Sequence, residues 1–366
     1  MTARVDRRRF LAGALTSPWL ASAAVAAAGE EQKPVAAGRT ADIHIHLFGI
    51  GDSNSGCSLS KKITDGPVFK LLTAKLKGWQ KQLSEKGGAS PKTLDETYVE
   101  VLAGLLAGSG LDKGSILAQD AAYDRRGKPD WERTHFFIPN RYLFEVVAKH
   151  AKLMVPCVSI NPDREDALAE LKWCAERGAR LLKIHPPTQG VDISDKRHTE
   201  FFRDCARRKI VVLVHTGHEH SAPTFDIDLA NPQRLELALN EGCTVVACHC
   251  GTGWPTDKPD MLVTFLDMLK RHENLYGDTS ILGSIGRAVD AGRLRKHDWA
   301  LKRLVHGSDF PFPSSPLAFT ASIGPVEAAR IQGIKNPLQQ DLALKGALGF
   351  GRASAERAYR MATGVS

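Results

Sequence analysis

The chain has 366 residues, of which 43% are hydrophobic and 25% are charged, a composition typical of a globular protein rather than of a disordered or membrane-spanning one. The formal net charge of +8 owes much to four arginines near the start of the chain. No basic stripe with interleaved aromatic residues favours a nucleic-acid partner, and the length allows one large α/β domain or two smaller ones.

The first 28 residues have the features of an export signal. Residues 7–11 contain three arginines followed by Phe and Leu, as in a twin-arginine signal, and an alanine-rich, weakly apolar run follows to residue 28. Small residues near Ala27 and Gly29 provide cleavage sites. We therefore predict a signal peptide at 1–28, export by the twin-arginine machinery, and a periplasmic mature chain at 29–366 without a membrane span. The alternative is an uncleaved anchor, which the short run disfavours.

The first strongly strand-like run is Asp42-Ile43-His44-Ile45-His46. Side chains alternate between the two faces of a strand, so Asp42, His44 and His46 share one face. Two neighbouring imidazoles can bind one metal ion, and zinc suits such a pair. The alternative is that one histidine is a hydrogen-bonded core residue and the other lies in a loop.

A long segment, residues 49–92, separates this strand from the next predicted helix. Within it, Phe69, Leu72, Leu76 and Trp79 recur at three- and four-residue spacing, which predicts an amphipathic helix. A connection of this length favours a lid over the strand end. A packed surface insertion is the alternative.

Eight short apolar runs separated by helical segments predict eight parallel strands. The predicted strands are 42–46, 115–119, 152–160, 179–184, 209–214, 244–248, 275–278 and 303–305. Eight βα units close naturally into a (β/α)8 TIM barrel, here with a long insertion after strand 1. A doubly wound open sheet is the alternative, but no Gly-x-Gly-x-x-Gly turn follows an early strand.

Metal-competent side chains follow several of these strands. Lys183 and His185 end the fourth strand, His215 follows the fifth, His249 the sixth and Asp309 the eighth. The carboxyl ends of barrel strands meet at one mouth, so we expect these groups to converge with the two histidines of the first strand. The seven cysteines are odd in number and scattered, which indicates buried apolar residues rather than a disulfide framework.

Four ordered motifs resemble the metal-ligand strands of the amidohydrolase superfamily. They are residues 42–46, Val214-His215-Thr216-Gly217, Ala247-Cys248-His249-Cys250-Gly251 and His306-Gly307-Ser308-Asp309-Phe310-Pro311. The chain is most similar to the amidohydrolase-related (amidohydrolase type 2) branch of metal-dependent hydrolases and decarboxylases. The resemblance extends from Ala41 to about Ala358.

The resemblance implies that one divalent ion is held by His44, His46, His215 and Asp309, with His249 beside the reacting water as an orienting or proton-transferring group. The implied ion is zinc, with manganese or iron as alternatives. In binuclear relatives a carboxylated lysine bridges two ions, and Lys183 stands where it would be needed. The Lys-Ile-His-Pro context at 183–186 resembles the mononuclear branch, so we favour one ion. His185 is then a substrate contact or a structural residue.

The implied activity is a metal-dependent hydrolase that uses a metal-activated water on an amide, ester or lactone of a small molecule. Asp309 would accept the proton of the water and deliver it to the leaving group. The first alternative is a non-oxidative decarboxylase or hydratase of a carboxylated aromatic or unsaturated acid, which needs an arginine for the carboxylate; Arg287 is the candidate. The second alternative is a non-catalytic ligand-binding barrel.

Overall fold

Eight parallel strands form the centre of the computed structural model, which describes residues 38–85 and 92–365. The strands are β1 (Ala41–His46), β3 (Lys113–Leu117), β5 (Met154–Ser159), β6 (Leu181–Ile184), β7 (Val211–His215), β8 (Val245–Cys248), β9 (Leu275–Asp278) and β10 (Leu304–Val305). Each boundary lies within two residues of the predicted one, so the predicted strands are confirmed.

The sheet curls until its two ends meet. Each strand pairs with the next in chain order, from β1 and β3 round to β9 and β10. The chain beyond β10 then bonds back to β1: Ile43 N donates to His306 O at 2.9 Å, His46 N to Phe310 O at 2.9 Å, and Asp309 N to His44 O at 2.9 Å. The fold is therefore the predicted (β/α)8 barrel.

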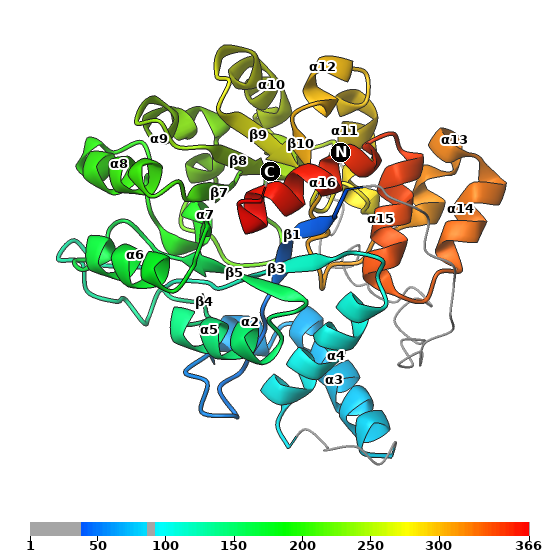
Figure 1. The fold of residues 1–366 in the computed structure, drawn as a ribbon, viewed down its shortest axis with the longest axis horizontal. Helices are drawn as coiled ribbons and strands as arrows, with labels where there is room; N and C mark the ends of the chain where they lie inside the picture. The colour runs from blue at the N-terminus through cyan, green and yellow to red at the C-terminus, as the bar shows by residue number, and fades with distance from the viewer. Residues whose placement is uncertain (1–37, 86–91, 366) are drawn as a thin grey trace, which may run out of the picture.

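Helices surround the sheet (Figure 1). The main ones between strands are α4 (Leu94–Ala107), α5 (Asn140–Lys149), α6 (Ala167–Glu176), α8 (Thr199–Arg207), α9 (Glu236–Asn240), α10 (Met261–Arg271) and α11 (Ala288–Leu294), with the short α7 (Pro186–Gln189) and α12 (Asp298–Leu301). After β10 come α13 (Thr320–Ile323), α14 (Pro325–Gln332), α15 (Pro337–Ala347) and α16 (Gly351–Thr363). Among the described residues, no helix has both the length and the apolar character needed to cross a membrane.

Two buried layers stabilise the barrel. One lies between the sheet and the helices, and the other fills the barrel with side chains such as Ile43, Leu181 and Leu213. Because both faces of a parallel sheet are buried, its strands are apolar throughout, as in Val211–Val214. Helix α16 crosses the amino-terminal end of the barrel and contributes Ala358 to the inner layer (Figure 1). The loops that follow the strands lie at the opposite, carboxyl end of the barrel.

The segment after β1 contains β2 (Ser58–Leu59), α2 (Lys61–Thr64) and α3 (Pro67–Glu85). Strand β2 pairs with β4 (Phe136–Phe137) in a separate antiparallel ribbon, which the sequence did not suggest. The buried carboxylate of Asp95 on α4 accepts hydrogen bonds from Ile50 N at 2.6 Å and Ser55 Oγ at 2.6 Å. These bonds tie the start of the segment to the barrel.

Candidate metal centre

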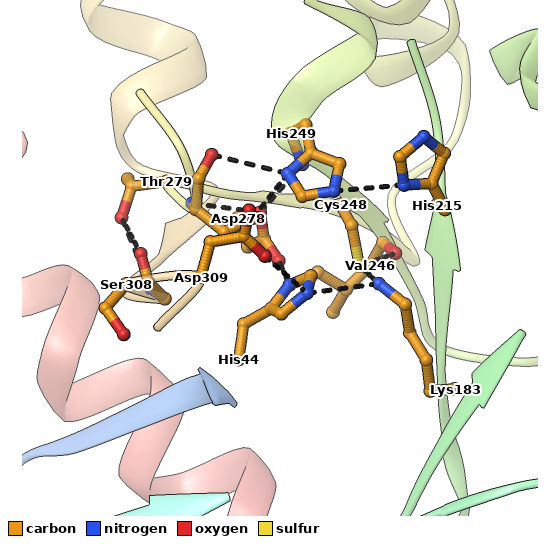
Figure 2. A network of polar contacts seen from close by, with 12 residues as sticks. His44, Lys183, His215, Val246, Cys248, His249, Asp278, Thr279, Ser308 and Asp309 are labelled. Atoms are coloured by element: carbon orange, nitrogen blue, oxygen red, sulfur yellow. Dashed lines mark hydrogen bonds and ion pairs between the residues drawn. The ribbon is translucent and has the colours of Figure 1, made fainter. Parts of the chain in front are cut away.

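The predicted site residues gather at the carboxyl ends of the strands. His44 and His46 lie at the end of β1, Lys183 lies in β6, and His215 is the last residue of β7. His249 begins the 3-10 helix η5 (His249–Gly251) after β8, and Asp309 follows β10. His249 and Asp309 have φ values of 64° and 68°, in the left-handed region. Asp and His enter this region more readily than most residues, and the sharp turn it produces brings both side chains into the group drawn in Figure 2.

Three of the four predicted ligands contact one another. The distance from Asp309 Oδ1 is 3.1 Å to His44 Nε2 and 3.1 Å to His46 Nε2. His44 is fully buried, whereas the side chain of His46 is 21% exposed toward the mouth. This cluster can present two imidazole nitrogens and a carboxylate oxygen to one ion, a donor set typical of zinc.

Asp278, at the end of β9, orients His44. Its Oδ2 lies 2.7 Å from His44 Nδ1, and its Oδ1 accepts hydrogen bonds from His249 N at 2.8 Å and Ser280 N at 3.1 Å. Burial alone would raise the pKa of the Asp278 carboxyl, but the charge and hydrogen bond of His44 outweigh burial and hold it well below its usual range. An ionised Asp278 accepts a hydrogen bond from His44 Nδ1 and so orients the ring with Nε2 facing Asp309 (Figure 2).

A chain of hydrogen bonds also fixes the tautomer of His215. Ser280 Oγ donates to Asp278 Oδ1, so it accepts from His249 Nδ1, 2.8 Å away. His249 Nε2 is then unprotonated and accepts from His215 Nδ1 at 3.1 Å. The proton of His215 is therefore on Nδ1. Its Nε2 carries a lone pair, is buried, and has no hydrogen-bond partner among the described residues.

Protonation at the centre follows from burial and from neighbouring charges. Burial lowers the pKa of His249 to about 3 and that of His215 well below its usual value, so both rings are neutral at pH 7. Burial and Lys183 also lower the pKa of His44, but nearby Cys248, Asp278 and Asp309 outweigh them and raise it well above its usual value. The surroundings of His44 thus favour the positively charged form of its ring.

A second group of donors lies beside the first. His185 Nε2 is 3.2 Å from Glu219 Oε2, and the ring of His185 stacks on that of His215 with centroids 3.9 Å apart. His215, His185 and Glu219 have ligand atoms within 4.8 Å of one another, as do His44, His249 and Asp309. His215 therefore lies between the two groups. It contacts the first group only through its hydrogen bond with His249, and it does not touch the other three predicted ligands.

Lys183 is buried at the centre. Its Nζ lies 3.0 Å from Cys248 Sγ and 3.3 Å from His44 Nε2 (Figure 2). Its neighbours are thus a thiol and an imidazole of the first group. All seven cysteines are buried and free, in line with the sequence interpretation.

Asp42 binds the backbone of residues at the centre. Its Oδ1 accepts hydrogen bonds from His44 N at 2.9 Å and Ser308 N at 3.0 Å, which ties β1 to the loop that carries Asp309. Burial raises the pKa of the Asp42 carboxyl to about 7. Asp42 thus orients the backbone of the site residues.

A cavity of about 750 Å³ opens above the centre. Its lining includes the predicted site residues, apolar side chains of α3, and residues of the loops after β7, β8 and β9. In these loops, His218 Nε2 lies 2.9 Å from Pro259 O and His220 Nε2 lies 2.7 Å from Asp257 Oδ2. A cavity of this size accommodates a small-molecule substrate.

Comparison with known proteins gives a family and a fold. The sequence profile of the Amidohydrolase family matches residues 41–323. An uncharacterized TIM-barrel protein, Bb4693 from Bordetella bronchiseptica, is 18% identical over 85% of this chain and 99% of its own, with a TM-score of 0.53. No curated protein matches at a significant level.

Two solved decarboxylases are more distant. The 2,6-dihydroxybenzoate decarboxylase from Rhizobium is 14% identical over 88% of this chain and 99% of its own, with a TM-score of 0.46. The 5-carboxyvanillate decarboxylase from Novosphingobium aromaticivorans, solved with bound manganese, is 12% identical over 82% of this chain and 94% of its own, with a TM-score of 0.44.

Proposed function

The chain belongs to the amidohydrolase family, and from this premise we propose that it is a metal-dependent hydrolase that cleaves an amide, ester or lactone bond of a small molecule. We further propose that one divalent ion, zinc, is held by His44, His46, His215 and Asp309. Manganese and iron are the alternatives.

One observation carries the proposal of a metal. His44 Nε2 and His46 Nε2 both lie 3.1 Å from Asp309 Oδ1, so two imidazole nitrogens and a carboxylate oxygen converge at one point of the barrel mouth. This set of ligand atoms is typical of a zinc site. His215 Nε2 has no hydrogen-bond partner among the described residues and lies 3.7 Å from Glu219 Oε2, so it offers a third imidazole nitrogen beside this cluster. The residues present therefore fit a divalent ion.

A divalent ion bound here would lower the pKa of water toward about 7 and polarise a carbonyl group. Asp309 is the residue that we propose to move the proton. Burial would raise the pKa of its carboxyl, but His44 and His249 outweigh burial and hold it well below its usual range, so the carboxylate is ionised and can accept a proton on Oδ2. The same oxygen can then deliver that proton to the leaving group.

His249 is the second residue to which we assign a role. Its Nδ1 proton is bonded to Ser280 Oγ, and its backbone N is held by Asp278. The ring is thus fixed and neutral, with its Nε2 on the side of His215. We propose that it orients the reacting groups by hydrogen bonding and keeps His215 in the tautomer that leaves Nε2 unprotonated.

Non-oxidative decarboxylation or hydration of a carboxylated acid on the same site is the second candidate. The observation that favours it is Arg287, a buried arginine that lines the cavity. A barrel that binds a ligand without catalysis is the third candidate, and the same assay separates all three.

The test is a screen of lactones, N-acyl compounds and aromatic acids with the zinc- or manganese-loaded protein. We expect hydrolysis of at least one of the first two classes, and we expect Asp309→Asn to lower kcat by roughly 100-fold or more because the proton acceptor is lost. Asp298→Asn, at an exposed aspartate of α12, is the matched control and should be silent. Full activity of Asp309→Asn would refute the assignment, and release of CO2 alone would select the decarboxylase.

A further inference from the structure

The loop that carries Asp309 is bound by helix α15 on both sides of this residue. Gly307, two residues before Asp309, accepts a hydrogen bond on its carbonyl oxygen from Lys345 Nζ. Ser314, five residues after Asp309, donates from Oγ to Asp341 Oδ1 at 2.5 Å. Lys345 and Asp341 lie one helical turn apart on α15 and form an ion pair, with Nζ 2.6 Å from Oδ2. One helix thus holds the chain before and after the proposed proton carrier.

The conformation of Asp309 requires contacts of this kind. Its φ of 68° lies in the left-handed region, which a residue with a side chain keeps only where its surroundings impose it. On the barrel side, Asp309 N donates to His44 O at 2.9 Å and Ser308 N donates to Asp42 Oδ1 at 3.0 Å. Those bonds come from β1, whereas the bonds described above come from α15. The loop is therefore fixed between two elements.

Helix α15 is itself anchored at its start. Asn336 caps the first turn by accepting a hydrogen bond from Leu338 N at 3.0 Å, and Pro337 occupies the first helical position. The same asparagine donates from Nδ2 to Leu105 O of helix α4 at 2.7 Å. Leu344, from the same helix, is fully buried in the apolar layer outside the sheet. The loop is thus bound to a helix that the rest of the fold holds in place.

The two charges on α15 are deeply buried. The side chains of Lys345 and Asp341 are 2% and 4% exposed. Burial raises the pKa of the Asp341 carboxyl, and Lys345 and Ser314 offset this only in part, so the folded protein disfavours the ionised carboxylate. A well-packed apolar pair is often as stable as a buried ion pair. Stability alone therefore does not account for these charges, whereas their hydrogen bonds to the loop do.

We propose that Lys345 and Asp341 are positioning residues for Asp309, which keep its carboxylate beside the two imidazoles of β1. They act through the backbone of Gly307 and the hydroxyl group of Ser314, not by contact with the ion or the substrate. The inference rests on the proposed function, in which Asp309 is a metal ligand and carries the proton, and it adds helix α15 to the parts of the chain on which that function depends.

The test is a double variant, Lys345→Met with Asp341→Leu. Removal of one partner would leave the other charge buried and unpaired, but the apolar pair should leave the free energy of unfolding in urea nearly unchanged. The double variant loses both bonds from α15 to the loop. We expect its dissociation constant for zinc, measured by competition with a chromophoric chelator, to rise about 10-fold or more, because groups that orient metal ligands have effects of this size.

The visible absorption spectrum of the cobalt-loaded protein provides a second measurement. The absorption bands of Co²⁺ depend on the number and geometry of its ligands, so a change in stability alone does not move them. We expect the bands of the double variant to differ from those of the wild-type protein. If the double variant does not fold, Ser314→Ala decides: it removes one of the two bonds and should raise the dissociation constant for zinc at least about twofold.

Asp204→Leu with Arg208→Met is the matched control. These residues also form an ion pair four positions apart, with Arg208 Nε 2.8 Å from Asp204 Oδ2, at the end of α8. No residue of α8 lines the cavity, so the control should keep the zinc affinity and the cobalt spectrum of the wild-type protein. A zinc affinity within twofold of wild type in the folded double variant would overturn the proposal, as would an unchanged cobalt spectrum. An unchanged zinc affinity in Ser314→Ala, where that variant has to decide, would do the same.

The outcome is separable from that of the proposed function. Weaker zinc binding in Asp309→Asn together with wild-type binding in the double variant would refute the positioning role alone. Weaker binding in both, without hydrolysis of any compound in the screen, would leave the positioning role standing and refute the hydrolase. Unchanged zinc binding in Asp309→Asn would refute the metal centre, and the positioning role with it.

Discussion

At the scale of single residues, the centre depends on where protons are held. Asp278 keeps the proton of His44 on Nδ1, and through Ser280 and His249 it also determines which nitrogen of His215 is free. One buried carboxylate thus presets two imidazoles for metal binding. A hydrogen-bond acceptor at the ring nitrogen that does not bind the metal raises the basicity of a ligand histidine and fixes the orientation of its ring.

Asp278→Asn tests this role. The amide still fits the space but loses the negative charge beside His44, so we expect the affinity for zinc to fall roughly 10- to 100-fold. Competition with a chromophoric chelator measures the dissociation constant. Asp298→Asn serves again as the exposed control, and a less than twofold change in Asp278→Asn would show that Asp278 has no such role.

The sequence pointed to His44, His46, His215, His249 and Asp309 because each is a metal-competent residue at the end of a predicted strand. Their roles as ligands and proton carriers stay predictions.

Two further residues of the site gave no such signal. Asp278 ends the predicted strand 275–278 but received no role, because its partner His44 lies 234 positions away and only barrel closure joins them. A search for acidic residues at strand ends would have found it. Glu219 lies in a loop, where spacing predicts little about which side chains turn inward.

At the scale of elements, the site depends on close contact between β1 and the chain after β10. Gly307 lies in that chain, and a Cβ atom added there would stand 2.7 Å from the Cβ of His44. Its lack of a side chain therefore allows the His44 strand and the Asp309 loop to approach each other. The backbone hydrogen bond that Asp309 N donates to His44 O at 2.9 Å needs the same proximity.

Gly307→Ala should push His44 away from Asp309. We expect a loss of about 1 to 3 kcal/mol in the free energy of unfolding from overpacking, together with weaker metal binding. Gly292→Ala is the matched control, because a Cβ at Gly292 in helix α11 meets nothing within 4 Å. The free energy of unfolding of Gly292→Ala should rise by up to about 1 kcal/mol, because alanine has a higher helix propensity than glycine. Urea denaturation compares them, and equal stability of the two variants would contradict the account.

Helix α3 carries a lysine on its half-buried side. Burial lowers the pKa of Lys75 from 10.5 to about 8, and its Nζ lies 4.4 Å from the centre of the Trp79 ring. A lowered pKa means that the charged form is disfavoured in the folded protein. The cost is complete below pH 8 and disappears as the pH rises toward the value of 10.5 in the unfolded chain.

Lys75→Met should therefore stabilise the protein by roughly 1 to 2 kcal/mol at pH 7, and the gain should shrink as the pH rises from 8 to 10. Urea denaturation at several pH values provides the measurement. Lys77→Met, at an exposed lysine of the same helix, should have a small effect that does not vary in this way. If the stability of both variants changed with pH in the same way, burial of Lys75 would not be the cause of the pH-dependent gain.

At the scale of the whole molecule, barrel closure places the four predicted ligands at one mouth. The number and order of the strands could be predicted because each parallel strand is a short apolar run bounded by helical segments. The helices after β10 could not be assigned a place in advance, although α16 closes the amino-terminal end of the barrel. Which segments cover an end of a barrel depends on tertiary packing, which periodicity does not report.

The insertion after β1 includes α3, whose side chains line the cavity, and we propose that residues 49–92 act as its lid. The predicted signal peptide at 1–28 lies outside the described residues. Export by the twin-arginine machinery and a periplasmic location therefore stay predictions. Export in the folded state would let the protein acquire its ion in the cytoplasm.

We propose that one ion is bound at the barrel mouth by residues of β1, of β7 and of the chain after β10. Anomalous diffraction from crystals of the zinc-loaded protein, recorded at the zinc absorption edge, tests it most directly. We predict one strong peak per chain, within coordination distance of His44, His46, His215 and Asp309. A peak between His185, His215 and Glu219 instead, or no peak at the barrel mouth, would contradict the account.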